Sequence, residues 1–387
     1  MGRRRAGVLV AGASLAVASV GVIVSCGART PLDFDGDTSS FLDASRGDVK
    51  NAFDGRDDSD TPDEPPPIPV ACTPGQFPLT IAATRLMFVL DRSASMGASL
   101  DGQDPPNGAS KWQVLRDALA QTILPFDQQI AMGAKFFPAA NARLDPSNPG
   151  LACLVDNGVA VAPRRGNASL IIDTFQSTSP DGATPTSEAL SIAASSIRAN
   201  RAVARSIVLA TDGAPNCNAA LDGSSCVCAT TVGSCAEFAG LCLDDLRTIE
   251  TVRRIADTDG IPVYVIGMGN TERPEFLRVL DDMAVAGGQP RPSAPRHYNV
   301  QTPAELASAL TTIRDSASTC TYVTPSSPTD PNGMGVEIDG RPVPRDPTRK
   351  VGWDWLDQTY GTVGFFGADC ERVQSSRNIV AKVRCSP

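Results

Sequence analysis

The 387-residue sequence is poor in the residues on which many enzymes depend. It contains one histidine, His297, and none of its five lysines follows a glycine, so a phosphate-binding P-loop is absent. It also has no Gly-x-Ser-x-Gly and no His-Glu-x-x-His segment, the signatures of serine hydrolases and zinc metalloproteases. A lone histidine near the end of an expected strand is more often structural or merely exposed. The sequence therefore favours a protein that is not an enzyme.

Basic residues are also in the minority, with 34 Lys and Arg against 43 Asp and Glu and a formal net charge of −9. This balance argues against nucleic acid or anionic lipid as the main partner. Hydrophobic residues make up 42% of the chain, which excludes wholesale disorder. The length allows one full-sized domain with appendages, or two modest domains.

The first 26 residues are typical of an export signal. Arg3–Arg5 form a basic start, and 6–25 is an uncharged run rich in small apolar residues. The run ends in Ile23-Val24-Ser25-Cys26, which resembles a bacterial lipobox, so lipid on Cys26 is expected. A plain secretory signal or an uncleaved anchor are the alternatives, and all three export the rest of the chain. Gly27 is not the Asp that would suggest inner-membrane retention, which favours the outer membrane.

Residues 27–71 are rich in Asp, Ser and Pro and end in a proline-rich stretch. We expect a disordered, acidic tether that holds the folded part away from the membrane. The only membrane contact expected is through the N-terminal lipid.

The cysteine count agrees with export. With Cys26 assigned to lipid, ten of the eleven cysteines remain, an even number that suggests five disulfides in an oxidising compartment. A zinc site would have to be all-cysteine, and the Cys226-Val227-Cys228 gap is not the usual one. The candidates for disulfides are Cys72, Cys153, Cys217, Cys226, Cys228, Cys235, Cys242, Cys320, Cys370 and Cys385.

From Thr84 onward, expected strands and helices alternate. Hydrophobic patterns predict strands at 85–90, 130–137, 158–162, 206–210, 261–266 and 297–300. Helical spacing predicts helices at 112–124, 167–175, 186–200, 243–257, 274–286 and 303–316. This alternation indicates an α/β fold with a doubly wound, mostly parallel sheet.

The pattern changes after Cys320. A hairpin is expected at 336–343, turning at Asp339-Gly340, with further strands at 362–366 and 379–384. Trp353 and Trp355 could supply a small core, which at this size needs disulfides. Residues 320–387 are therefore expected to form a small β-rich unit.

Three polar stretches follow expected strands or precede a helix. They are Asp91-Arg-Ser-Ala-Ser-Met-Gly97, Gly182-Ala-Thr-Pro185 and Thr211-Asp-Gly213. Loops at the carboxyl ends of parallel strands gather along one edge, so these stretches should meet there. They bring two carboxylates and three hydroxyls, which suit a hard cation such as Mg²⁺ or Mn²⁺. The expected metal site comprises Asp91, Ser93, Ser95, Thr184 and Asp212.

These motifs, in this order and on these elements, resemble the metal-ion-dependent adhesion site of von Willebrand factor type A and integrin inserted domains. The resemblance covers roughly 79–318, and a domain at 72–319 is expected. It implies a six-stranded sheet and a metal ion held by Ser93, Ser95 and Thr184, with Asp91 and Asp212 acting largely through water. It also implies adhesion, in which an Asp or Glu of a protein partner completes the coordination.

A cysteine-rich insertion at 214–243 departs from the family pattern and should lie beside the metal, where it sets specificity or occludes the site. We expect Cys153 to pair with one insertion cysteine and the other four to pair among themselves. Cys72–Cys320 would then join the domain ends, and Cys370–Cys385 would staple the C-terminal unit.

Two other interpretations stay open. Asp91, Ser93 and Thr184 could merely stabilise loops and helix ends, which would make the protein a metal-free scaffold of the envelope. A metal-dependent hydrolase of the dehalogenase or phosphatase type is disfavoured, because it would need a second carboxylate two residues after Asp91. The expected function is that of a cell-envelope lipoprotein that binds a protein partner.

Overall fold

A computed structural model of the chain describes residues 69–103, 108–199, 203–229, 234–269 and 273–385. The expected signal peptide, Cys26 and nearly all of the expected tether lie outside these residues. Of the helices in the described ranges, none has the length and apolar character needed to cross a membrane.

The α/β domain is built on a six-stranded sheet with the order β5-β4-β3-β6-β7-β8. All neighbours run parallel except β4 and β5, which are antiparallel. In chain order the strands are β3 (Thr84–Asp91), β4 (Ala131–Phe137), β5 (Val161–Arg164), β6 (Ala204–Thr211), β7 (Val263–Met268) and β8 (Tyr298–Val300).

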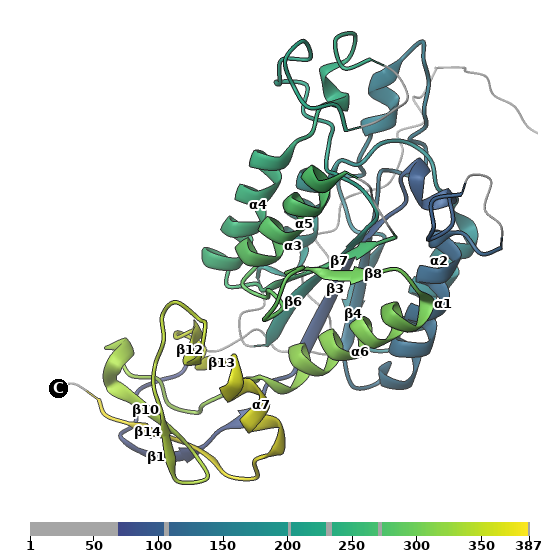
Figure 1. Cartoon of the computed structure of the whole chain (residues 1–387). Coiled ribbons are helices and arrows are strands. Elements are labelled where there is room, and N and C mark those ends of the chain that lie inside the picture. The colour runs from purple at the N-terminus through teal and green to yellow at the C-terminus, as the bar shows by residue number, and fades with distance from the viewer. Residues whose placement is uncertain (1–68, 104–107, 200–202, 230–233, 270–272, 386–387) are drawn as a thin grey trace, which may run out of the picture. The chain divides into compact units, whose positions relative to one another are not determined.

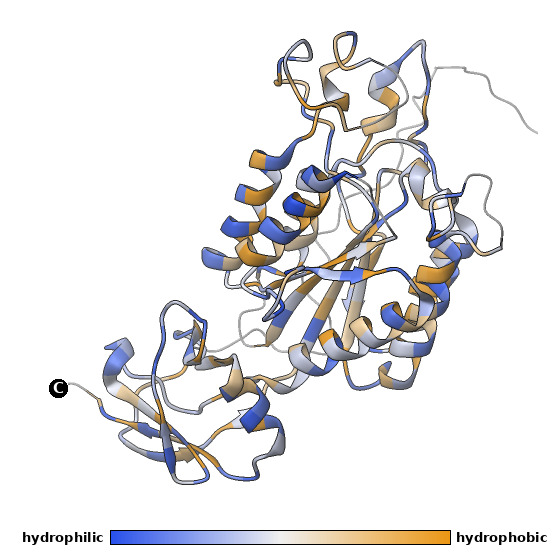
Figure 2. Ribbon diagram, viewed as in Figure 1, coloured by the Kyte–Doolittle hydropathy of each residue, from blue (hydrophilic) through white to orange (hydrophobic). Residues whose placement is uncertain are grey.

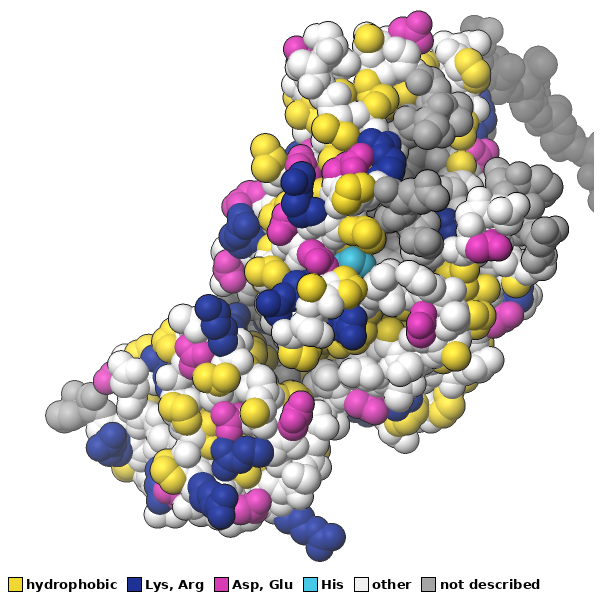
Figure 3. Space-filling model, viewed as in Figure 1, with side chains coloured by type: hydrophobic (Ala, Val, Ile, Leu, Met, Phe, Trp, Pro, Cys, Tyr) yellow, Lys and Arg dark blue, Asp and Glu magenta, His cyan; other side chains and the backbone are white. Residues whose placement is uncertain are grey.

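Helices cover both faces of this sheet (Figure 1). One face carries α1 (Lys111–Ile123), α2 (Ala168–Ser177) and α6 (Pro303–Thr319), and the other carries α3 (Thr186–Ile197), α4 (Asp245–Asp257) and α5 (Pro274–Ala286). Strand β3 serves both layers, because Leu86, Phe88 and Leu90 join one core while Met87 and Val89 join the other. The central strands are accordingly apolar over most of their length, whereas the helices turn polar residues outward (Figure 2). On the face shown in Figure 3, acidic and basic side chains are interspersed along the outer surface of the described residues.

The fold class predicted from the sequence is confirmed, and every strand and helix expected in this domain is present. The largest shift concerns the strand expected at 158–162, which is β5 at Val161–Arg164. Gly158 lies in the preceding loop, where its carbonyl oxygen accepts a hydrogen bond of 2.7 Å from Lys135 Nζ.

The β-rich unit consists of two four-stranded antiparallel sheets, β1-β14-β10-β11 and β12-β13-β9-β2. Its elements are β1 (Gly75–Pro78), β2 (Thr80–Ile81), β9 (Thr321–Val323), β10 (Met334–Ile338), β11 (Arg341–Val343), β12 (Gly352–Asp357), β13 (Thr362–Phe366), α7 (Ala368–Ser375) and β14 (Ile379–Val383). The hairpin at Asp339-Gly340 and the core role of Trp353 and Trp355 are confirmed. The two indole rings pack edge to face with their centroids 5.5 Å apart.

The β-rich unit also takes two strands from before the α/β domain, which the sequence analysis assigned to that domain. Strand β1 pairs with β14 and β2 pairs with β9, and Phe77 packs against the core of the unit. The α/β domain is therefore inserted between β2 and β9. Because these two strands are neighbours, with Thr80 opposite Val323, the chain leaves and re-enters the β-rich unit at adjacent positions.

The ten candidate cysteines form five disulfides. Cys153–Cys217 confirms the predicted link from the loop before β5 to the insertion, and Cys226–Cys242 and Cys228–Cys235 confirm pairing within the insertion. The other two predicted pairs are wrong, because the bonds are Cys72–Cys385 and Cys320–Cys370. The reason is the unforeseen pairing of β1 with β14, which brings the segment around Cys72 beside the end of the chain.

The Cys72–Cys385 bond spans 313 residues and joins the two ends of the folded part. We predict that the double variant Cys72→Ser/Cys385→Ser loses about 2–5 kcal/mol of stability, because the unfolded chain gains freedom. Urea unfolding measures this loss. The matched variant Cys228→Ser/Cys235→Ser opens a separation of only 7 residues and should lose less. A peptide map that links Cys72 to Cys320 would contradict the structure.

Candidate metal centre

Two neighbouring parallel strands place the two acidic residues of the predicted site. Asp91 is the last residue of β3, and Asp212 directly follows β6, which ends at Thr211. The pairing of Leu90 with Ala210 brings both strand ends to the same edge of the sheet. A short 3-10 helix at Ala94–Gly97 then turns the chain, so that Ser93 and Ser95 lie beside the carboxylates.

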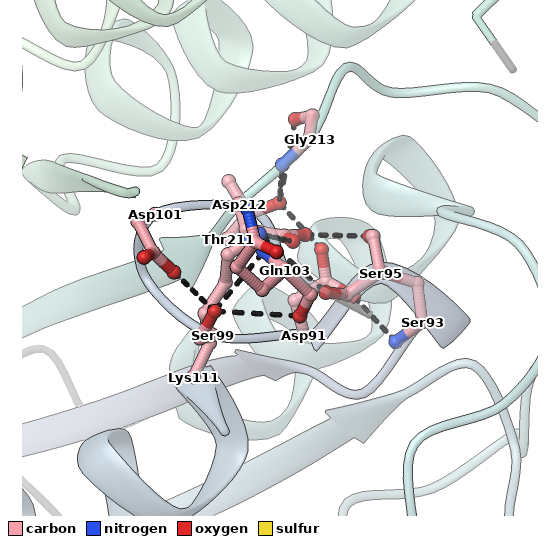
Figure 4. A network of polar contacts seen from close by, with 10 residues as sticks. All are labelled: Asp91, Ser93, Ser95, Ser99, Asp101, Gln103, Lys111, Thr211, Asp212 and Gly213. Atoms are coloured by element: carbon pink, nitrogen blue, oxygen red, sulfur yellow. Dashed lines mark hydrogen bonds and ion pairs between the residues drawn. The ribbon is translucent and has the colours of Figure 1, made fainter. Parts of the chain in front are cut away.

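A continuous hydrogen-bond network joins these side chains (Figure 4). Asp91 accepts a hydrogen bond of 2.7 Å from the Ser93 backbone N–H and one of 2.5 Å from the Thr211 hydroxyl. Ser95 Oγ lies 3.2 Å from Ser93 Oγ and donates to Asp212 Oδ1 at 2.8 Å. Four of the five predicted site residues therefore converge on one point.

The fifth predicted residue, Thr184, lies on an adjoining loop. The Asn216 side chain accepts a hydrogen bond of 2.7 Å from the Thr184 N–H, and the Asn216 N–H donates 2.9 Å to the Thr184 carbonyl. This loop is joined to the first motif by a 3.1 Å hydrogen bond from Ala94 N to the Gly182 carbonyl. Thr184 is buried at the same edge of the sheet, but it shares no hydrogen bond with the other four predicted residues.

Arg92, within the first motif, holds the surrounding loops together, a role that the sequence analysis missed. Its guanidinium donates to the carbonyl oxygens of Ser179, Pro138 and Ala139, and the side chain is buried. The loops that follow β4 and α2 are thereby tied to the loop that carries Ser93 and Ser95. This bracing fixes the hydroxyls before any ligand binds.

The site is electrostatically strained in the absence of a cation. Burial and, to a smaller extent, the nearby negative charge of Asp212 raise the pKa of Asp91 to about 7, although the hydrogen bonds from Thr211 and Ser93 lower it. A positive charge at this point would relieve that repulsion.

A cationic side chain, Lys111, also reaches the site, and no motif in the sequence predicts this. Lys111 begins α1, where Ser110 and Gln113 form a capping box. Its Nζ lies 2.7 Å from Asp212 Oδ2 and donates at 3.4 Å to the Ser95 carbonyl. No sequence spacing links position 111 to the motif residues, because the path of the chain before α1 brings Lys111 close to Asp212.

The cysteine-rich insertion follows directly after Asp212, and its Cys217 is bonded to Cys153 on the loop after β4. Both loops gather at the end of the sheet where the motifs lie (Figure 1). Asp91, Ser93 and Thr184 are buried, whereas Ser95 is exposed. The described part of the insertion therefore leaves one side of the site open.

The residues fit a hard divalent cation. Their donors are oxygens, and adjacent ligands of an octahedral ion with bonds of 2.0–2.1 Å lie about 3 Å apart. The 3.2 Å between Ser93 Oγ and Ser95 Oγ matches this spacing. A close group of cysteines, Cys226, Cys235 and Cys242, offers no rival site, because all three sulfurs are in disulfides.

The sheet order, with one antiparallel edge strand, agrees with the fold that the motifs predict, and the three motifs lie at the carboxyl ends of β3 and β6 and before α3. In these features the α/β domain resembles von Willebrand factor type A domains. No protein-family model matches the chain, and no curated protein matches its sequence.

Three solved structures similar to this chain come from bacterial pili. The PilB minor pilin from Streptococcus sanguinis shares 18% identity over 61% of each chain, with a TM-score of 0.43. The pilus adhesin SpaC from Lactobacillus rhamnosus GG shares 12% identity over 80% of this chain and 41% of that chain, with a TM-score of 0.44. The von Willebrand domain of the type V pili tip protein Mfa5 from Porphyromonas gingivalis shares 12% identity over 60% of this chain and 94% of that chain, with a TM-score of 0.39.

The chain thus spans about three fifths of the minor pilin and two fifths of the adhesin. Likeness at these identities concerns the fold alone. Any activity of the type A-like domain has to be argued from its own residues.

The raised pKa of Asp91 predicts a pH dependence of the metal-free protein. Because the folded-state pKa of about 7 lies above the usual 3.8, the folded protein binds more protons than the unfolded chain between these values. Its stability should therefore fall as pH rises from about 4 to about 7. Asp91→Asn, which keeps an acceptor for the Ser93 N–H, should remove this contribution, on the order of a few kcal/mol.

Urea midpoints in EDTA at several pH values measure this effect. Asp257→Asn is the control, since Asp257 is exposed on α4 and should leave the pH dependence unchanged. Parallel pH profiles for wild type and Asp91→Asn would show that Asp91 ionises normally.

Proposed function

We propose that this protein is an exported binding protein whose type A-like domain grips a protein partner through a divalent cation, Mg²⁺ or Mn²⁺. The observation that carries the proposal is the convergence of Asp91, Ser93, Ser95 and Asp212 at one partly open point. The neighbouring buried Thr184 completes the expected donor set.

The chain's own residues would divide the work. Ser93, Ser95 and Thr184 would hold the cation directly, and Asp91 and Asp212 would act through water. The cation, when bound, supplies a Lewis-acidic position for an oxygen ligand from outside. Because the direct ligands are neutral hydroxyls, that position would favour a carboxylate from an Asp or Glu of the partner. Arg92 keeps the hydroxyls in place, and the loops around the site would contribute specificity.

Five disulfides support placement in an oxidising compartment. Together with the lipobox-like segment ending at Cys26, they support a lipid-anchored protein of the cell envelope, with the outer membrane favoured. The site lacks a free thiol, a histidine and a second carboxylate two residues after Asp91, which supports binding rather than catalysis.

A metal-free scaffold is the second candidate, and one observation favours it. Lys111 neutralises Asp212 and thereby closes the network without any ion. Under that alternative the motif residues would only stabilise loops.

Thermal unfolding separates these two functions. We predict that saturating Mg²⁺ or Mn²⁺ raises the melting midpoint of the full-length, disulfide-bonded protein above its value in EDTA. An ion at 100 times its dissociation constant adds about 2.7 kcal/mol, which corresponds to roughly 5–10 °C in a domain of this size. Asp91→Ala should abolish the rise, and Asp257→Ala should keep it. The absence of a rise with either metal would favour the scaffold.

Partner recognition has a separate test on peptide arrays. We predict that the protein retains Asp- or Glu-containing peptides in Mg²⁺ but not in EDTA, and does not retain the matched Asn and Gln peptides. Ser93→Ala/Ser95→Ala should lose this binding, because two of the three direct ligands are removed. Retention that is equal in Mg²⁺ and EDTA would contradict a metal-bridged contact.

A further inference from the structure

Lys111 is a buried cationic residue in direct contact with the proposed metal centre. Its side chain is only 10% exposed, and its Nζ lies 2.7 Å from Asp212 Oδ2. The other carboxylate oxygen of Asp212 accepts from Ser95 Oγ at 2.8 Å. Both oxygens of Asp212 are thus engaged by the chain itself.

Without its ion pair to Asp212, a lysine at position 111 would be unfavourable. Lys111 begins α1, where the helix dipole disfavours a positive charge, and burial of an ammonium group removes its hydration. The ion pair with Asp212 compensates for both effects. Gly269 also leaves space for the Lys111 side chain. Any larger residue at position 269 would place its Cβ 2.9 Å from Lys111 Cε, which is too close. Gly269 has a φ of +84°, which favours glycine there in any case.

The ammonium changes what the site offers to a cation. Without Lys111 the Asp212 carboxylate would present its full negative charge to a divalent ion, whereas the paired lysine cancels this charge. A positive charge so near also repels an incoming cation directly. The metal-free site is stabilised, and the gain on binding an ion is reduced.

We propose that Lys111 is an internal counter-cation that competes with the divalent ion for Asp212 and so sets the cation affinity of the site. The domain would then stay folded without metal and bind it only where the ion is abundant, as outside the cell. This inference rests on the metal-dependent binding proposed above and concerns its regulation.

The test is a Mn²⁺ titration of the full-length, disulfide-bonded protein. Binding is measured by calorimetry and by the electron paramagnetic resonance signal of free Mn²⁺. We predict that Lys111→Met binds Mn²⁺ about tenfold more tightly than wild type, or more, since one opposing charge is removed. Lys111→Arg keeps the charge and should stay near the wild-type affinity. Lys382→Met is the control, because it removes the Lys382–Glu337 pair on the β-rich unit, between β14 and β10.

Thermal unfolding of the same variants provides a second measurement. In EDTA, Lys111→Met should melt below wild type, because Asp212 has lost its counter-charge, and saturating Mn²⁺ should close this gap. Lys111→Gln, which retains a donor but no charge, provides the same comparison if the Met variant does not fold.

The outcomes separate this inference from the proposed function. Tighter Mn²⁺ binding by Lys111→Met or Lys111→Gln than by wild type supports the inference. This holds even if wild type binds Mn²⁺ too weakly for its affinity to be measured. Equal affinity in wild type and Lys111→Met overturns it and leaves the metal site intact. No Mn²⁺ binding by any variant overturns both.

Discussion

The parallel pairing of β3 with β6 is the constraint on which the rest of the site depends. It brings Asp91 and Asp212 to one edge of a sheet that is buried on both faces, where the two carboxylates repel each other. Neighbouring groups reduce this repulsion by hydrogen bonding to Asp91 and by pairing with Asp212. Thr211 and the Ser93 N–H donate to Asp91, and Lys111 neutralises Asp212.

The periphery of the domain serves to hold that edge in shape. Arg92 joins its own loop to two others through their carbonyl oxygens, and Cys153–Cys217 ties the insertion to the loop after β4. The α/β domain itself is inserted between two adjacent strands of the β-rich unit. Loops held by these hydrogen bonds and this disulfide suit a site that has to present hydroxyls in a fixed geometry.

Much of this could be predicted from the sequence, because the signals are local. Apolar runs located the buried strands, and the order of the three motifs identified a von Willebrand type A-like domain. Contacts between distant segments could not be predicted. Strand β1 has only four residues and mixed polarity, so its pairing with β14, and with it the Cys72–Cys385 bond, left no periodic signal. Lys111 could not be predicted for the same reason, since no periodic pattern links it to Asp91 across residues 92–110.

Diffraction from crystals grown with Mn²⁺ would show whether these oxygens form a cation site. We expect a single strong anomalous peak bounded by the hydroxyls of Ser93, Ser95 and Thr184, which is missing in crystals of Asp91→Ala. Crystals soaked in millimolar Mn²⁺ that show no anomalous density there, with Lys111 still paired to Asp212, would contradict it.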